Sequence, residues 1–461
     1  MTSQYLVDPG GPAIPIQPIA KEELPTWRAR AGAIAQRWIE ATSFDAAPGK
    51  SLLVPGRNGE LESVLLGVSE PTPWDWAALP LELPRGTYRI EGYHSPKEAD
   101  AAALGWALGT YRFERMRSKK EAAPPSLEWP EACNRPRVTA MAEATALVRD
   151  LINTPASDLG PAELAGAAEQ LANDNEASFH VIVGDDLLEK NYPAIHAVGR
   201  AAAPSRAPRL IELSWGEASH PKVTLVGKGV CFDSGGLDLK PATNMKLMKK
   251  DMGGAAHVLG VAAMVMGAKL PLRLRVLIPA VENAVSGSAM RPLDVVPTRK
   301  GLTIEIGNTD AEGRVILADA LAEASGESPS LLIDFATLTG AARVALGAEL
   351  PAMFANDDEL ASALLACATG ESDPLWRMPL FEPYRKLIDS KVADITNAPE
   401  APLGGAITAA LFLREFVGDG IPWAHIDLMA WNQSSRPGRP EGGEAMGLRA
   451  VYALLEERFK K

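Results

Sequence analysis

Apolar and polar residues alternate over the first quarter of the chain in short segments. Strand-like runs occur at 51–56, 62–68 and 87–93, and the segment that starts at Pro96 has apolar residues at helical spacing and ends in basic residues. The stretch that follows, from Ser118 to Pro136, is polar, contains prolines and has no periodicity. We therefore predict an N-terminal α/β domain over residues 1–120 and a linker over 121–136.

From Arg137 the pattern changes to longer apolar runs separated by helix-length segments. A long helix is expected here, stopped by Asn153, Thr154 and Pro155. Strands are expected at 179–184, 209–215, 222–229, 275–284, 302–308, 331–340 and 424–430, with helices after Asp251 and after Arg314. Nearly continuous apolar strands alternating with helices are typical of a buried, mostly parallel sheet. We predict a second domain over 137–461, with such a central sheet flanked by helices.

Composition narrows the class of protein. The chain has 461 residues, 46% hydrophobic and 23% charged, which fits an ordinary globular protein, and its net charge of -12 argues against a nucleic-acid surface spread over the chain. Its three cysteines form no CxxC pair, which suits a reducing compartment. The first 20 residues lack the basic region and apolar core of a signal peptide, and no apolar run is long enough to span a membrane. A cytoplasmic location is therefore expected.

Charged residues gather in two glycine-rich segments, VGKGVCFDSGGLDLKPATNMKLMKKDMGGAA and GNTDAEGR. Their carboxylates are Asp233, Asp251, Asp310 and Glu312. Carboxylates beside buried strands are costly unless something neutralises them. Oxygen ligands suit magnesium, manganese or zinc, and a bridging carboxylate suits a pair of ions about 3.5–4 Å apart. The pattern therefore indicates a site for two divalent cations.

The neighbouring residues carry further expectations. Asp310, Glu312 and Arg314 would face one way in an extended loop, and a helix starting directly after Arg314 would add an anion-friendly N-terminus. Lys228 and Lys240 could each bind metal as neutral amines or polarise a substrate oxygen. Against this stands the fact that a single aspartate in a glycine loop is more often a turn former. We interpret three other lysines as a solvated helix face: Lys246, Lys249 and Lys250.

The segments VGKG, FDSGG, KKDMGGAA and NTDAEGR together resemble the signature set of the cytosol (leucyl) aminopeptidase family of dinuclear metallopeptidases, peptidase family M17. Further matches lie at 334–341, 404–416 and 423–430, so the resemblance covers roughly 137–461. It implies two divalent metal ions per subunit, Mn²⁺ or Zn²⁺ and possibly Mg²⁺. The implied ligands are Asp233 and Glu312 as bridges, Asp310 on one metal through its side chain and carbonyl, and Lys228 and Asp251 on the other.

The resemblance also implies catalytic and pocket residues. Lys240 would polarise the scissile carbonyl, and Arg314 would hold a bicarbonate ion that acts as general base. The side chain of the first substrate residue would lie in a pocket formed by Met248, Thr337, Leu338 and Gly340. The implied activity is hydrolysis of the N-terminal residue, leucine and similar, from short peptides by a metal-activated water. The implied assembly is a homohexamer.

Some residues depart from the family pattern, and some invite other interpretations. Asp238 in GLDLK and the segment ENAVSGSAM are atypical, as is GGEAMGLRA. We interpret His257 as a packed residue rather than a metal ligand, and Cys231 as a small buried hydrophobe. Two alternatives to an enzyme are DNA binding through the basic cluster at 115–120 and an inactive scaffold. The scaffold is disfavoured because no ligand position is missing.

Overall fold

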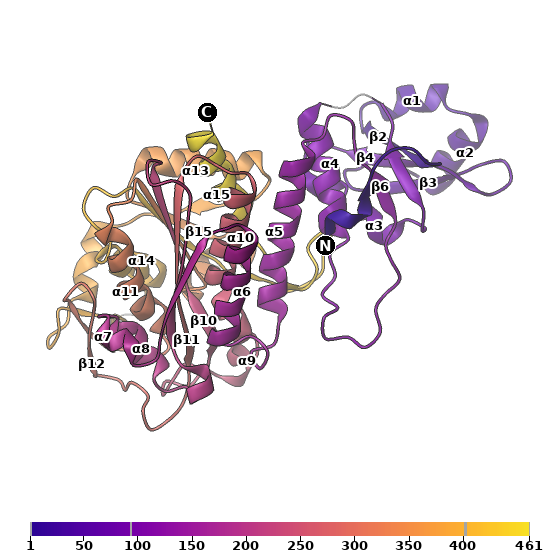
Figure 1. Ribbon diagram of the computed structural model, residues 1–461. Helices are drawn as coiled ribbons and strands as arrows, with labels where there is room; N and C mark the ends of the chain where they lie inside the picture. The colour runs from indigo at the N-terminus through magenta and orange to yellow at the C-terminus, as the bar shows by residue number, and fades with distance from the viewer. Residues whose placement is uncertain (1, 93–94, 401–402, 461) are drawn as a thin grey trace. The chain divides into compact units, whose positions relative to one another are not determined.

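The computed structural model describes residues 2–92, 95–400 and 403–460 (Figure 1). These residues form two compact units by their contacts, Met1–Ala146 with Ser434–Glu441, and Leu147–Gln433 with Gly442–Lys461. The division falls inside the long helix α5 (Arg135–Asn153), whose C-terminal end was predicted. The limits 1–120, 121–136 and 137–461 stay a prediction.

The N-terminal unit is built on a six-stranded sheet in the order β1-β6-β5-β2-β4-β3, in which only the β3–β4 pair is antiparallel. The three predicted strands are present, although the third prediction reaches Tyr93, which lies outside the described residues. Helix α4 begins where Ser95 and Glu98 form a capping box with Pro96 in the first turn. The strands are β1 (Leu6–Val7), β2 (Ile14–Ala20), β3 (Ser51–Pro55), β4 (Leu61–Val68), β5 (Thr87–Ile90) and β6 (Ser126–Glu128), and the helices are α1 (Leu24–Arg30), α2 (Ala33–Thr42), α3 (Leu79–Glu82) and α4 (Pro96–Gly109).

The segment predicted as a linker differs from expectation. Strand β6 lies within 121–136 and pairs with both β1 and β5, so it is an inner strand of the N-terminal sheet. A run of only three residues among prolines is too short for periodicity to reveal.

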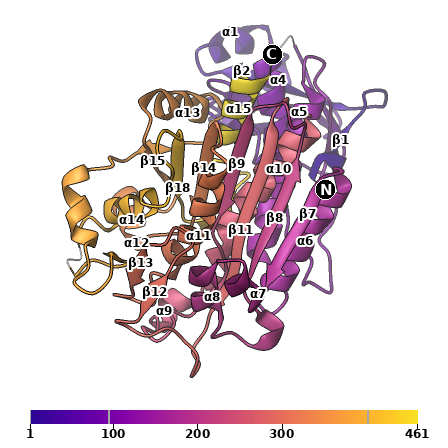
Figure 2. The same cartoon turned by 60° about the vertical axis from the view of Figure 1, so that its left-hand side comes forward.

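The second unit is organised around a nine-stranded sheet with the path β16-β15-β18-β14-β9-β11-β8-β7, which can be followed from β15 to β7 in Figure 2. Its middle pairs are parallel, whereas β7–β8, β8–β11 and β15–β18 are antiparallel. The predicted α/β fold with a mostly parallel sheet is confirmed. The strands are β7 (Ser178–Val183), β8 (Arg209–Trp215), β9 (Lys222–Gly227), β10 (Gly229–Asp233), which pairs with β11, β11 (Arg273–Asn283), β14 (Leu331–Ala336), β15 (Ala352–Ala355), β16 (Trp376–Arg377) and β18 (Trp423–Asp427).

Helices cover both faces of this sheet, which explains why all six residues of β14 are buried. On one face α10 packs against β9 and β14 and is itself covered by α15, and α6 and α13 flank them. On the other face lie α8, α11 and α14. The helices are α6 (Pro161–Asp174), α7 (Asp186–Glu189), α8 (Pro193–Gly199), α9 (Ala242–Met245), α10 (Gly253–Gly267), α11 (Glu312–Gly326), α12 (Gly340–Leu346), α13 (Asp358–Gly370), α14 (Gly405–Arg414) and α15 (Leu448–Phe459).

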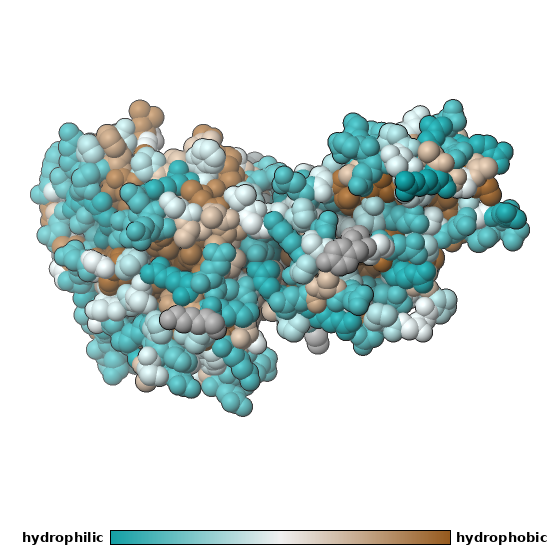
Figure 3. Space-filling model, turned by 90° about the horizontal axis from the view of Figure 1, so that it is seen from above, coloured by the Kyte–Doolittle hydropathy of each residue, from teal (hydrophilic) through white to brown (hydrophobic). Residues whose placement is uncertain are grey.

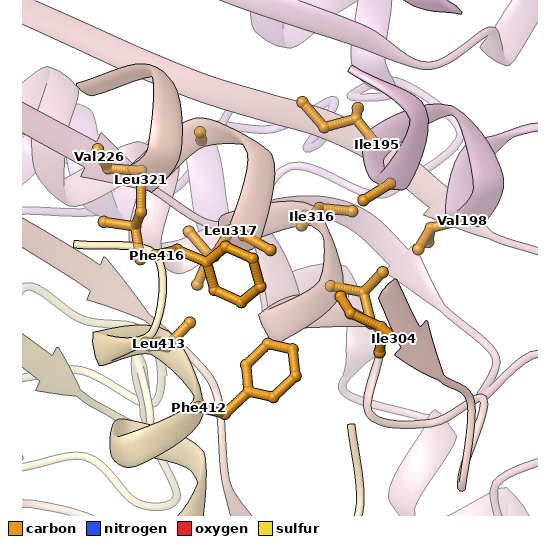
Figure 4. Packing of buried hydrophobic residues seen from close by; sticks show 14 of the residues in the cluster. Ile195, Val198, Val226, Ile304, Ile316, Leu317, Leu321, Phe412, Leu413 and Phe416 are labelled. Carbon is orange, nitrogen blue, oxygen red and sulfur yellow. The ribbon is translucent and has the colours of Figure 1, made fainter. Parts of the chain in front are cut away.

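One continuous hydrophobic core lies between the sheet and the helices α8, α11 and α14 (Figure 4). Ile316 and Leu317 of α11 lie at its centre and Phe412 of α14 packs into it, all fully buried. This packing fixes the first turns of α11, the helix that begins with Glu312.

The strand predicted at 302–308 does not belong to the central sheet. The segment 302–308 forms only β13 (Thr303–Glu305), in a small sheet with β12 (Val295–Pro297) and β17 (Ile395–Thr396). A second small sheet pairs β19 (Trp431–Asn432) with β20 (Gly442–Gly443). Asp310 therefore follows a strand of the small sheet rather than of the central one.

The face shown in Figure 3 is mainly hydrophilic, with smaller hydrophobic patches between polar residues. No helix among the described residues is both long enough and apolar enough to cross a membrane.

The close crossing of α10 over the sheet yields a stability prediction. A Cβ at Gly254 would lie 2.0 Å from the Phe335 carbonyl oxygen and 2.7 Å from the Lys228 amide, so Gly254→Ala must force the helix away. We expect a loss of at least about 2 kcal/mol in urea unfolding. Gly267→Ala is the matched control, because nothing lies within 4 Å at the other end of α10. Equal stability of the two variants would contradict this packing argument.

Candidate metal centre

The four carboxylates of the charged segments come from different elements of the second unit. Asp233 ends β10, and Asp251 lies in the 3-10 turn Met248–Met252 directly before α10. Asp310 follows the small sheet, and Glu312 is the first residue of α11. Each carboxylate is therefore held at an element end, where the backbone can point it into a shared space.

The structure brings these groups together. Asp233, Asp310 and Glu312 each offer an oxygen within 4.8 Å of the others. Lys228 Nζ lies 2.7 Å from Asp251 and 2.9 Å from Glu312, which joins the fourth carboxylate to the cluster. Lys240 Nζ lies 2.8 Å from Asp233 and 2.5 Å from Asp310. All five predicted metal ligands and Lys240 thus form one continuous set of contacts.

Charge in this cluster is unbalanced, since two ammonium groups face four carboxylates. Burial, followed by the charge of Asp233, raises the pKa of Glu312 to about 8 and that of Asp310 to about 6. Burial alone would lower the pKa of Lys228, but Asp251 and Glu312 outweigh it and raise that pKa. Added positive charge would therefore stabilise the cluster.

The donor set fits divalent cations. Three buried carboxylate oxygens have a lysine ammonium as their partner: Asp251 Oδ2 and Glu312 Oε1 lie beside Lys228, and Asp310 Oδ1 lies beside Lys240. Glu312 Oε2 is buried without a partner among the described residues. Buried polar atoms are normally satisfied, and clustered carboxylate oxygens are what magnesium, manganese and zinc accept. The cluster thus has more carboxylate oxygens than its two lysines can neutralise.

Thr309 and Asp238 join the two charged segments. The Asp238 amide donates to Thr309 Oγ1 at 2.8 Å, and the Thr309 amide donates to Asp238 Oδ2 at 2.7 Å. Thr309 Oγ1 also donates to the Gly235 carbonyl at 2.6 Å, in a turn where Gly235 has φ +90°. Asp238 and Thr309 thus join the loop after Asp233 to the loop that carries Asp310.

Two asparagines that the sequence did not single out support the same loops. Asn283 Nδ2 donates to Asp233 Oδ1 at 2.9 Å and to the Thr309 carbonyl at 3.1 Å. Asn397, fully buried, donates to the carbonyls of Asn308 and Ala311 and accepts from the Gly307 and Asn308 amides. Asn283 lies in the atypical segment ENAVSGSAM, but nothing near Asn397 in the sequence signals its role.

Arg314 differs from its predicted setting. Helix α11 begins at Glu312, so Glu312 and Arg314 lie in its first turn and not in an extended loop before it. Arg314 Nη1 donates to the Asn397 carbonyl at 2.6 Å, and its Nε is buried without a partner. Burial lowers the pKa of Arg314 to about 10. The extended-loop prediction is wrong because the glycine in AEGR is accommodated in a helical turn.

A cavity of ≈ 440 Å³ opens beside the cluster. All four predicted pocket residues line it: Met248, Thr337, Leu338 and Gly340. Thr337 is tied to the cluster, because its hydroxyl donates to Asp251 Oδ1 at 2.7 Å and its carbonyl accepts from Lys228 Nζ at 3.0 Å. The cavity is therefore a direct extension of the charged centre.

The expectation that Lys246, Lys249 and Lys250 form one solvated face is wrong for two of them. Lys246 is exposed, but Lys249 donates to the Asn153 carbonyl at 2.5 Å. Lys250 is only 5% exposed and lines the cavity. The tight 3-10 turn before Asp251 separates three lysines that a continuous helix would have kept close.

The residues interpreted as packing groups are buried. Cys231 is 1% exposed. His257 is fully buried, its Nδ1 lies 2.6 Å from the Gly253 carbonyl, and its Nε2 accepts from the Met446 amide at 2.8 Å. Both ring nitrogens are thus used by the backbone, which leaves none for a metal.

The two bonds of His257 require the neutral ring, and burial lowers its pKa to about 4, below the ordinary 6.5. Its contribution to stability is therefore complete above pH 6.5 and is lost as the pH falls through about 4. In the unchanged chain, the titration of His257 lowers the free energy of unfolding as the pH falls from 6.5 to about 4. In His257→Gln we expect the decrease over this pH range to be smaller by about 2–3 kcal/mol. Exposed His180 supplies the control, His180→Gln. Identical pH profiles for His257→Gln and the unchanged chain would contradict the assignment.

Comparisons with known proteins agree with this geometry. The model of the cytosol aminopeptidase family, catalytic domain, matches residues 146–452, and that of the M17 aminopeptidase N-terminal domain matches 14–125. A probable cytosol aminopeptidase of Roseiflexus castenholzii is 44% identical over 323 residues, 69% of this chain and 65% of that protein. Peptidase B of Pectobacterium carotovorum is 43% identical over 68% of this chain and 74% of its own length. The matched region thus spans just under two thirds of the Roseiflexus relative.

Solved structures extend the likeness to the whole fold. The crystal structure of cytosol aminopeptidase from Coxiella burnetii is 52% identical, covers 99% of this chain and 100% of its own, and has a TM-score of 0.94. The bottromycin maturation enzyme BotP in complex with Mn is 35% identical, with a TM-score of 0.87 over 97% of this chain and 100% of its own. With its family model matched across the unit that holds the carboxylate cluster, the chain belongs to the cytosol aminopeptidase family.

Proposed function

We propose that the chain is a metal-dependent aminopeptidase that hydrolyses the N-terminal residue from short peptides. The observation that carries the proposal is the cluster of four carboxylates, which only two lysines compensate, beside a peptide-sized cavity. Asp233 and Glu312 would bridge two ions, with Asp310 on one and Lys228 and Asp251 on the other. Bound divalent ions would supply Lewis-acid activation of water and of the peptide carbonyl. Manganese is the first candidate, since a relative was solved with Mn.

The chain's own residues have distinct proposed tasks. Lys240 lines the cavity between Asp233 and Asp310, so its ammonium would polarise the scissile carbonyl and stabilise the oxyanion. Arg314 would hold a bicarbonate ion as general base, which its unpartnered Nε supports. Met248, Thr337, Leu338 and Gly340 would enclose the first side chain of the substrate.

We further propose a homohexamer in the cytoplasm. Exposed apolar side chains on the second unit, Val344 at 84% and Leu403 at 79%, support burial by further subunits. The three cysteines are all unpaired, as suits a reducing compartment. Light scattering should give six times the mass of one chain, and a mass of a single chain would contradict the assembly.

The activity is tested with metal-stripped protein to which Mn²⁺, Zn²⁺ or Mg²⁺ is returned, using leucine p-nitroanilide. We expect hydrolysis with at least one ion and a loss on the order of 10³-fold in kcat for Glu312→Gln, because a bridging charge is removed. Glu359→Gln, an exposed change of the same kind on α13, should retain full activity. Absence of hydrolysis with every ion, or full activity of Glu312→Gln, would overturn the proposal.

A further inference from the structure

Two cations that the proposed chemistry does not use line the cavity beside the carboxylate cluster. They are Lys250, from the 3-10 turn Met248–Met252, and Arg343, from α12. Lys250 is 95% buried, and a buried charge without a partner is costly. Lys250 therefore calls for a binding partner of opposite charge, and Arg343, which is exposed, is available to join it.

Lys250 has no carboxylate of its own among the described residues. Its chain neighbour Asp251 gives Oδ2 to Lys228 at 2.7 Å and Oδ1 to the Thr337 hydroxyl at 2.7 Å. The negative charge of Asp251 acts on Lys250. The ammonium of Lys250 nevertheless makes no ion pair or side-chain hydrogen bond within the parts of the chain that the structure describes. Its side chain reaches the cavity instead.

Arg343 is similarly free to bind a ligand. Its Nη1 donates a hydrogen bond to Met429 Sδ at 3.6 Å. This bond is weak, because a thioether sulfur is a weak acceptor. Its Nη2 would lie 3.8 Å from a Cβ placed on Gly340, so the guanidinium sits over a predicted pocket residue. The planar donors of arginine suit a carboxylate partner.

The remaining carboxylate that lines the cavity, Asp427, does not neutralise the pair. Its Oδ1 accepts from the Leu338 and Thr339 amides at 3.0 and 3.1 Å, and its Oδ2 accepts from the Thr339 hydroxyl at 2.6 Å. Both oxygens are thus used to shape the loop before α12. Apolar side chains complete the lining: Leu247, Met248, Leu350 and Met429.

We propose that this cavity receives an acidic side chain, so that the favoured substrates are peptides whose first residue is glutamate or aspartate. The side-chain carboxylate would accept charge-assisted hydrogen bonds from Lys250 and Arg343, while its methylene groups contact the methionines and leucines. A leucine in the same place would cover Lys250 without pairing it. A lysine would be repelled. This inference rests on the proposed aminopeptidase activity and specifies its substrate class.

The test uses the manganese-loaded full chain and four p-nitroanilides, of glutamate, glutamine, leucine and lysine. Glutamine has nearly the shape of glutamate without its charge, so the ratio of kcat/KM between the two isolates the carboxylate. We expect glutamate to exceed glutamine at least tenfold and lysine to be the poorest substrate. In Arg343→Gln and in Lys250→Met that ratio should fall at least fivefold, mainly through KM. The control Lys246→Met removes an exposed lysine of the same segment and should leave the ratio unchanged.

The outcomes separate the two proposals. Hydrolysis of the leucine substrate with a glutamate-to-glutamine ratio of one or less would overturn this inference and leave the aminopeptidase activity in place. No hydrolysis of any of the four would overturn both. Because Lys250 adjoins Asp251, a Lys250→Met protein that fails to fold leaves the decision to Arg343→Gln, whose side chain is on the surface of α12. An unchanged ratio in Arg343→Gln would also overturn the inference.

Discussion

The mutual repulsion of four carboxylates in one largely buried space is the constraint on which the rest of the second unit depends. Asp233, Asp251 and Glu312 are almost inaccessible to water, and two lysines provide only half of the compensating charge. Such an arrangement persists only if the backbone holds it in place. The packed core under α11 and the crossing of α10 over the sheet at Gly254 provide that support.

A layer of hydrogen bonds then holds the loops that carry the carboxylates. Thr309 and Asp238 bind the two loops to each other, and Asn283 and Asn397 satisfy the backbone of those loops from outside. Thr337 orients Asp251 and contacts Lys228 with its carbonyl. The threonines and asparagines are uncharged and Asp238 is itself a carboxylate, so these partners position the cluster without correcting its excess of negative charge. That task is left to divalent cations.

The cavity is lined by charges of both signs. Asp233 and Asp310 line it and are paired with Lys240, and Lys250 and Arg343 line it without a carboxylate of their own among the described residues. A substrate with a free amine and an acidic side chain would offer a partner to both kinds of charge. Metal binding and substrate choice are thus two consequences of how the same few segments distribute their charges.

Local patterns in the sequence predicted much of this arrangement. The run of β14, apolar except for Asp334, indicated a sheet covered on both faces, and two glycine-rich segments indicated the carboxylate cluster. What could not be predicted depends on contacts distant in sequence. Asn397 lies 85 residues beyond Glu312 in the sequence. A strand as short as β13 does not show which sheet it joins. The burial of Lys250 follows from a 3-10 turn, which cannot be recognised in a segment with three lysines. The roles assigned to the site residues stay predictions.

The most direct test of this account is the number of metal ions bound per chain. Manganese titrated into metal-stripped protein and counted by elemental analysis after gel filtration should reach two ions per chain, and Asp233→Asn should remove at least one of them. A full chain that binds no manganese or zinc, or an Asp233→Asn variant that still binds two ions as tightly, would contradict the central claim that divalent cations neutralise the cluster.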